Sequence, residues 1–306
     1  MIISASRRAD IPACFSQWFF RRLEEGFVCV RNPMIYHQVS RVSLSPKVVD
    51  GILFWTKNPI PMLESLHLLD AYPFYFQFTL TAYGNDLEPG VPGKNSIIIP
   101  AFQELSRRIG PERVIWRYDP ILLTPKYSAE YHARYFEELA RRLSGYTTKC
   151  IISFVDQYRH LGEQFQSLNT EQIFKLAGRL SEIARKYGLM LETCAESLDL
   201  SEFGIRHGHC VDAELLEQII GQPLSLSKDK KQRAACGCMA SIDIGMYGTC
   251  ANGCKYCYAN HAPATVSRNL KSHDPFSALL CGNLTPEDII RDRTVASCKE
   301  IQESFF

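Results

Sequence analysis

The sequence predicts an α/β fold in which parallel strands form a partial or complete (β/α) barrel, with a cysteine-rich C-terminal part. Strand-like apolar runs alternate with helix-like runs at least six times, and neither a repeat of fixed period nor a low-complexity linker divides the 306 residues. Alternating strands and helices form parallel sheets through right-handed crossovers. We therefore expect a single domain over residues 1–306, with a cysteine-rich metal-binding part at 194–260.

The expected elements follow one another in regular order. The strand-like runs are 1–6, 51–56, 75–81, 113–120, 149–156, 188–196 and 240–247. The helix-like runs are 16–26, 61–70, 100–110, 128–145, about 170–187 and 212–221. Gly26 is suited to end the first helix, and Ser128 is a favourable N-cap for the fourth. Residues 262–306 are expected to form a helical cover, in which Thr285 caps a helix at 284–293.

The composition argues against several classes of protein. Hydrophobic residues make up 46% of the chain and charged residues 22%, as in ordinary globular proteins. A net charge of +1 gives no overall attraction to nucleic acid or to a membrane surface. The chain begins without the apolar stretch of a signal peptide, and it has no run of about 18 apolar residues. We expect a cytoplasmic protein without a membrane partner, while nucleic acid stays an open possibility.

Polar and charged side chains follow six consecutive strand-like runs. They include Arg7, Arg8, Lys57, Arg117, Asp119, Asp156 and Glu192. The C-terminal ends of barrel strands build active sites, so we expect these side chains to converge on one mouth. The candidate catalytic residues among them are Arg7, Arg8, Arg117 and Asp119. Paired arginines can fork around a carboxylate or phosphate, which favours an anionic substrate; the alternatives are solvated loop residues or Arg–Asp salt bridges that tie the loops.

Three cysteines stand close together in the stretch TCANGCKYCYAN. Cys250, Cys254 and Cys257 have the spacing Cys-x3-Cys-x2-Cys. Without a secretion signal, clustered thiols indicate metal ligands rather than disulfides. Structural zinc usually takes four ligands, whereas three thiols on one tight loop suit a 4Fe–4S cluster whose fourth iron stays open. The alternative is a zinc site completed by His261 or by a remote thiol.

This motif resembles the signature of the radical S-adenosylmethionine enzymes, including the aromatic residue, Tyr256, before the last cysteine. The resemblance implies a 4Fe–4S cluster that binds S-adenosylmethionine and cleaves it to a 5′-deoxyadenosyl radical, which abstracts hydrogen. It further implies that Tyr256 lies by the adenine and that Lys57 meets the carboxylate of this cofactor. Thr79 and Thr81 would then hydrogen-bond its ribose or amino group.

The position of the motif differs from that in the family, where it lies near the N-terminus. A circular permutation reconciles the two, if the strand at 240–247 and the cysteine stretch are the family's first unit and residues 1–6 its second. The stretches FWTKNP, FTLTAYGNDLEPGVP and RVIWRYDPILL resemble consecutive strand ends of the spore photoproduct lyase-like branch. SRRADIP and GCKYCYAN also resemble a permuted family of uncharacterised bacterial proteins, a domain of unknown function, over nearly the whole chain.

Four further cysteines lie in loops or at a strand end. They are Cys194, Cys210, Cys236 and Cys238. Four thiols suffice for a closed site, so we expect a second 4Fe–4S cluster or a zinc ion, with His207 and His209 as spare ligands for zinc. The remaining cysteines are expected to be structural: Cys14, Cys29, Cys150, Cys281 and Cys298.

Together these patterns predict an iron–sulfur enzyme that cleaves S-adenosylmethionine and acts on a small-molecule or nucleotide substrate. It would receive electrons from a cellular donor such as flavodoxin or ferredoxin. The alternative is a non-radical iron–sulfur or zinc protein that serves electron transfer or nucleic-acid binding. The polar strand ends favour the enzyme, because an electron carrier needs no lined mouth.

Overall fold

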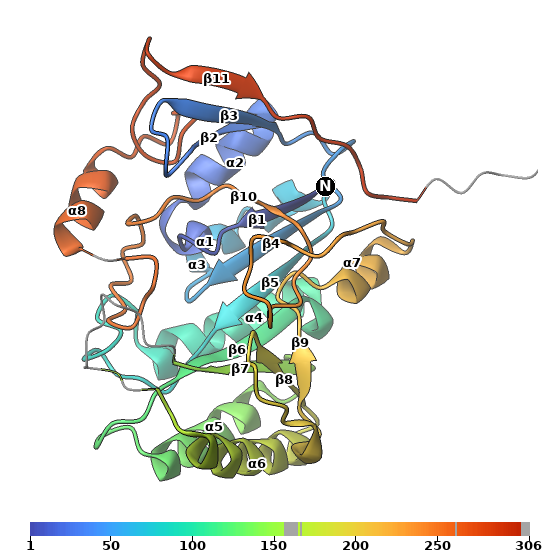
Figure 1. The fold of residues 1–306 in the computed structure, drawn as a ribbon, viewed down its shortest axis with the longest axis vertical. Helices are drawn as coiled ribbons and strands as arrows, with labels where there is room; N and C mark the ends of the chain where they lie inside the picture. The colour runs from blue at the N-terminus through green and yellow to red at the C-terminus, as the bar shows by residue number, and fades with distance from the viewer. Residues whose placement is uncertain (156–164, 166, 261, 301–306) are drawn as a thin grey trace, which may run out of the picture.

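The computed structural model describes residues 1–155, 165, 167–260 and 262–300, and its centre is an eight-stranded parallel sheet (Figure 1). The strand order is β10-β1-β4-β5-β6-β7-β8-β9. The bounds are Ile242–Asp243 for β10, Ile2–Ala5 for β1, Gly51–Thr56 for β4, Phe74–Thr79 for β5, Val114–Ile121 for β6, Lys149–Phe154 for β7, Met190–Cys194 for β8 and Arg206–Gly208 for β9. In the described part of the chain the edge strands β10 and β9 do not pair, so the sheet is a partial barrel. The expected α/β fold is confirmed at this level.

Helices cover the sheet and follow the expected order. Their bounds are Ile11–Cys14 for α1, Ser16–Glu25 for α2, Ile60–Leu63 for α3, Ile99–Ile109 for α4, Ala129–Leu143 for α5, Thr170–Lys186 for α6, Ala213–Ile220 for α7 and Pro263–Lys271 for α8. The Ser128 side chain accepts from the Tyr131 amide at 3.2 Å, so it caps α5 as expected. Gly26, at φ 77°, ends α2 in the left-handed region that glycine adopts without strain.

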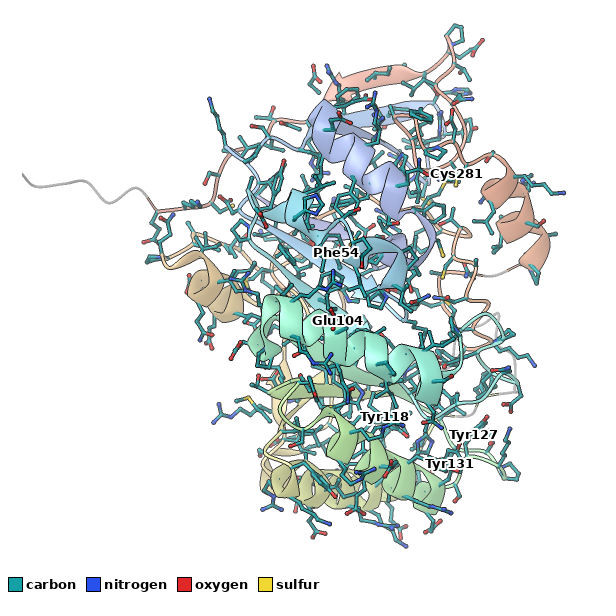
Figure 2. All side chains as sticks on the ribbon, turned by 180° about the vertical axis from the view of Figure 1, so that it is seen from behind. Phe54, Glu104, Tyr118, Tyr127, Tyr131 and Cys281 are labelled. Atoms are coloured by element: carbon teal, nitrogen blue, oxygen red, sulfur yellow. The ribbon has the colours of Figure 1, made fainter. Side chains whose placement is uncertain are left out.

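The two faces of the sheet pack against different elements. Seen from behind, α2, α4, α5 and α6 lie in front of the sheet, with Phe54 beneath them (Figure 2). In this layer the rings of Phe54 and Phe76 stack at 4.7 Å, and those of Trp116 and Phe136 at 4.8 Å. The opposite face is covered near its amino end by α7, whose Leu216 packs in a separate buried cluster. Toward the carboxyl end this second face carries no helix in the described chain, which leaves room for a pocket.

The second sheet contains a segment that was expected to be helical. It joins β2 (Phe27–Arg31), β3 (Gln38–Ser43) and β11 (Ile289–Asp292) in the order β11-β3-β2. The expectation of a helix at 284–293 is therefore wrong. Asp288 accepts from the Thr285 amide at 2.9 Å and pairs with Arg31 of β2, so the residue that would have filled the first helical turn instead anchors β11 beside β3.

Two other expected elements are shorter than the sequence suggested. Residues 61–70 break into α3 and a 3-10 turn at Leu66–Leu69. Leu63, Leu66 and Leu69 are all buried, and this three-residue spacing matches a 3-10 turn better than an α-helix. In 240–247 only Ile242 and Asp243 pair as a strand. None of the described helices is both long and apolar enough to cross a bilayer.

Candidate functional site

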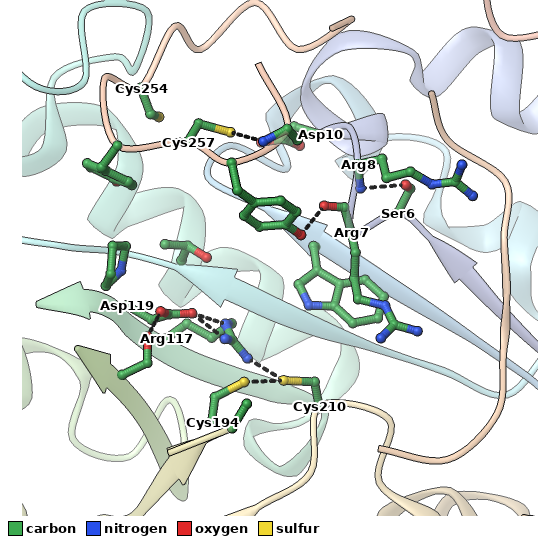
Figure 3. Close-up of a pocket in the computed structure, with 18 of the residues that line it drawn as sticks. Ser6, Arg7, Arg8, Asp10, Arg117, Asp119, Cys194, Cys210, Cys254 and Cys257 are labelled. Carbon is green, nitrogen blue, oxygen red and sulfur yellow. Dashed lines mark hydrogen bonds and ion pairs between the residues drawn. The ribbon is translucent and has the colours of Figure 1, made fainter. Parts of the chain in front are cut away.

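A pocket of about 370 Å³ opens at the carboxyl ends of the parallel strands. Its walls come from residues of β4, β5, β6, β7 and β8 or just after these strands, from the segments after β1 and β9, and from the loops on either side of β10 (Figure 3). Seven cysteines line it: Cys194, Cys210, Cys236, Cys238, Cys250, Cys254 and Cys257. Two groups of thiols that lie apart in the sequence therefore share one cavity. This is the edge of the sheet where β/α proteins place their substrates.

The first group lies on the cysteine loop, residues 250–257. Two backbone bonds dock this loop on the segment Leu87–Gly90: the Gly90 amide donates to Asn252 O at 3.0 Å and the Lys255 amide donates to Leu87 O at 2.9 Å. A Cβ at Gly90 would lie 2.5 Å from Ala251 O, so only glycine permits this approach. Burial raises the pKa of the Cys254 thiol to about 12. The Cys254 thiol is therefore protonated at neutral pH, and a metal could bind there only by displacing its proton.

Cys14 also belongs to this neighbourhood, although the sequence indicated a purely structural role. Its thiol, at the end of α1, hydrogen-bonds the Cys250 thiol, and this bond, with burial, raises the pKa of Cys250. The N-cap of α1, Asp10, accepts from the Asn252 side chain at 2.9 Å and from the Lys57 amide at 2.8 Å. No spacing in the sequence signals this contact, because Cys14 and Cys250 meet only when β1 and β10 pair.

A buried carboxylate, Glu88, organises the expected cofactor-binding side chains. Lys57 Nζ donates to Glu88 Oε1 at 2.8 Å, and the Thr81 hydroxyl donates to the same oxygen at 2.8 Å. The Tyr256 hydroxyl also donates to it, and Lys94 Nζ lies 2.5 Å from Glu88 Oε2. Burial would raise the pKa of Glu88, but the two ammonium groups outweigh it and lower the pKa to about 2.

Of the four residues that the sequence predicted to bind the cofactor, three line the pocket: Lys57, Thr79 and Tyr256. Thr81 does not, since its buried hydroxyl faces Glu88. Sequence reasoning missed Glu88 and Lys94 as site residues. The only signal for Glu88 is its place in the stretch LEP, whose resemblance to the lyase-like branch assigns no chemical role to the glutamate.

Arg7 and Arg8 are held at the pocket by Asp243, the last residue of β10. The carboxylate of Asp243 accepts from the Arg7 amide at 2.8 Å and from Arg8 Nε at 3.0 Å. The Arg7 guanidinium turns toward the pocket, 3.5 Å from Asp229 and stacked over the Trp55 ring at 5.8 Å. Both arginines therefore have carboxylate partners, as the salt-bridge alternative predicted, and both line the cavity.

Arg117 contacts both Asp119, the other candidate catalytic residue on β6, and the thiol of Cys210. Its Nε donates to Asp119 Oδ2 at 3.1 Å, and its Nη1 donates to the Cys210 sulfur at 2.8 Å (Figure 3). The Ser153 hydroxyl donates to the other Asp119 oxygen. Arg117 is buried, so this guanidinium is a fixed cation in the pocket wall rather than a mobile surface charge.

The second group of thiols, called here the tetrathiol cluster, consists of Cys194, Cys210, Cys236 and Cys238. The sulfurs of Cys194 and Cys210 lie 3.2 Å apart, and the Cys238 thiol hydrogen-bonds both the Cys210 and the Cys236 thiols. The His209 ring packs against Gly237, where a Cβ would lie 2.0 Å from its Nδ1. His207 instead faces the Thr193 hydroxyl at 3.3 Å.

Not every strand-end residue reaches the pocket. Glu192 lies on β8 two residues before Cys194 and does not line the pocket; it pairs instead with Lys149 at 3.1 Å. The expected convergence is therefore wrong for Glu192. Lys149 also pairs with Asp212, the N-cap of α7, at 3.1 Å. Asp156 and His261 lie outside the described residues. Among the residues that are described, no group of three or more His, Cys, Asp or Glu side chains is placed to hold a metal ion.

Comparison with known proteins gives one family. The model of a domain of unknown function (DUF1848) matches residues 2–259. The matched stretch contains the eight strands of the large sheet and the seven cysteines of the pocket, whereas α8 and β11 lie beyond it. A search of curated proteins found no match.

Proposed function

The chain belongs to the DUF1848 family, and we propose that it is an iron–sulfur enzyme that reductively cleaves S-adenosylmethionine. One observation carries the proposal: the three thiols of the cysteine loop line the pocket at the carboxyl ends of the parallel strands. Soft thiolates are the usual ligands of iron–sulfur clusters. A donor set of this kind on one docked loop fits a 4Fe–4S cluster.

When bound, such a cluster would pass one electron from a donor such as flavodoxin or ferredoxin to S-adenosylmethionine, which would then break into methionine and a hydrogen-abstracting 5′-deoxyadenosyl radical. The chain's own residues bind and orient. Lys57 uses one of its three N–H donors on Glu88, which leaves others for the carboxylate of S-adenosylmethionine. Tyr256, held by Glu88, offers its ring to the adenine, and Thr79 offers a hydroxyl to the ribose or amino group.

The substrate side of the pocket carries fixed positive groups and one broad ring. Arg7 over Trp55 presents a cation beside an aromatic face, and Arg117 stands across the cavity. This combination suits an anionic, nucleotide-like small molecule, whose charge and ring it would hold together. Asp119, fixed by Arg117 and Ser153, lines the same pocket and would orient a hydroxyl or amine of that substrate.

The strand order supports the permuted arrangement within this proposal. β10, which precedes the cysteine loop, pairs in parallel with β1 through Ile242 opposite Ile3. The strand of the large sheet that comes last in the sequence therefore stands first at that edge of the sheet, and the strand that begins the chain stands second. This is the order that a circular permutation of the family's layout requires.

A second candidate function rests on Cys14. Its hydrogen bond to Cys250 makes it a possible fourth thiolate for the cysteine loop. Four thiolates would close the site and leave no open iron, as in electron carriers and structural zinc sites. In that case the protein would be a non-radical iron–sulfur or zinc protein.

Anaerobic reconstitution of the Cys14→Ala and Cys254→Ala variants separates the two candidates. Under the enzyme proposal, wild type and Cys14→Ala bind about four irons at the loop and form 5′-deoxyadenosine with dithionite, whereas Cys254→Ala forms none. If Cys14→Ala loses its iron as fully as Cys254→Ala, the closed site is correct. Reconstituted wild type that holds its iron but leaves S-adenosylmethionine intact would also overturn the enzyme proposal.

A further inference from the structure

The four thiols of the tetrathiol cluster come from three segments that backbone bonds already hold together. Cys194 ends β8, Cys210 follows β9, and the other two lie in the loop before β10. The Met239 amide donates to Val211 O at 3.1 Å, and the Asp229 amide donates to Cys238 O at 2.9 Å. Cys194 stands opposite Gly208 in the β8–β9 pair, so the backbone that carries all four thiols is held in place.

The spacing of the sulfurs distinguishes zinc from a cubane. Around a tetrahedral zinc ion with Zn–S bonds of about 2.3 Å, neighbouring sulfurs lie about 3.8 Å apart. The Cys194 and Cys210 sulfurs lie only 3.2 Å apart, and all four thiols line the same pocket. A 4Fe–4S cluster puts each thiolate on a different iron and spreads the sulfurs further. We propose that the tetrathiol cluster binds one zinc ion, at a site separate from the cysteine loop.

The charges around the cluster suit such a site. Four thiolates and one Zn²⁺ carry a net charge of −2, which must be offset in a buried wall. Arg117 donates to the Cys210 sulfur at 2.8 Å and is itself fixed by Asp119. Hydrogen bonds from charged donors to metal-bound sulfur are typical of the outer shell of metal sites.

Binding requires the chain of sulfur contacts to close into a tetrahedron. In the described part of the chain no group of three or more His, Cys, Asp or Glu side chains is placed to hold a metal ion. The four side chains would have to turn toward one point, from segments whose backbones are already bonded to one another. The ion would then tie β8, β9 and the loop before β10 into one wall of the pocket, which is a structural role.

Metal analysis of the full chain tests this assignment without any activity measurement. Protein produced in zinc-supplemented medium is expected to hold about one zinc per chain, with four sulfur neighbours at about 2.3 Å in zinc-edge X-ray absorption. The double variant Cys236→Ser/Cys238→Ser should lose at least nine-tenths of that zinc. Cys281→Ser, which removes another buried thiol, and Cys254→Ala should both keep it.

Three results would overturn the assignment: no zinc in folded wild type, full zinc in the double variant, or a second iron–sulfur signal that the double variant removes. If the double variant does not fold, cobalt titration of metal-free wild type replaces it, and a tetrahedral tetrathiolate spectrum is then required. Because Cys254→Ala empties the cysteine loop only, failure of the zinc site and failure of the proposed enzyme function give different patterns of metal loss.

Discussion

Lys57 Nζ lies 2.8 Å from Glu88 Oε1, and both side chains are largely buried. With Lys94 on the other carboxylate oxygen, two largely buried ammonium groups share a single carboxylate. We expect Glu88→Gln to lower the free energy of unfolding by about 3–5 kcal/mol, because it leaves two desolvated ammonium groups without a counter-charge. Urea denaturation measures this change.

The matched control is Glu138→Gln, which removes an exposed partner of Arg141. Exposed pairs contribute about 0–1 kcal/mol, so this variant should unfold close to wild type. Equal losses of stability in the two variants would contradict the conclusion that Glu88 is the shared counter-charge of Lys57 and Lys94.

Glycine at position 90 is required by the close approach of the cysteine loop. A Cβ there would lie 2.5 Å from Ala251 O and 2.9 Å from the Asn252 Cα, both of them backbone atoms that cannot turn aside. Gly90→Ala should therefore displace the loop and lower the iron bound after reconstitution several-fold. Gly93→Ala is the control, since its Cβ would meet only the Ser96 hydroxyl at 3.0 Å. Equal iron in both variants would contradict this account.

Asp243 holds the loop that carries Arg7 and Arg8. Replacing it with asparagine removes the charge opposite Arg8 and puts an amide N–H₂ where N–H groups now donate, so Asp243→Asn should destabilise the protein by about 1–3 kcal/mol. Asp292→Asn, on an exposed pair with Arg41 at 3.8 Å, should have almost no effect. Thermal unfolding of both variants compares them directly.

His132 makes the fold sensitive to acid. It is buried between the Tyr118 hydroxyl at 2.8 Å and Leu122 O at 2.9 Å, and burial lowers its pKa to about 4. In the unfolded chain the His132 imidazole binds a proton near pH 6.5, whereas in the folded protein it does so only near pH 4. The contribution of neutral His132 to the free energy of unfolding is therefore complete above pH 6.5, decreases as the pH falls, and stops changing below about pH 4. The loss amounts to about 3 kcal/mol.

His132→Gln keeps an acceptor for Tyr118 and a donor for Leu122 but does not titrate. The difference in unfolding free energy between wild type and His132→Gln should therefore change between pH 6.5 and pH 4. A difference that stays constant over this range would show that His132 does not carry the acid sensitivity.

The sequence determined the elements whose causes are local. The cap at Ser128, the stop at Gly26 and the apolar runs of the strands depend on near neighbours, and the structure has them where they were expected. The clustering of charged residues after the strands was also visible, because parallel strands bring their carboxyl ends to one edge. Glu192 was misplaced because strand position alone does not say how far a side chain lies from the mouth.

Only the tertiary structure decided which distant groups meet. Cys14 contacts Cys250 because β1 pairs with β10. Glu88 pairs with Lys57 and Lys94 because the segments that carry these residues pack together beside the cysteine loop. The segment at Ile289–Asp292 became a strand because β3 offered an unpaired edge and Arg31 held Asp288. Long-range pairing and burial set these contacts, and neither leaves a spacing that can be found along the chain.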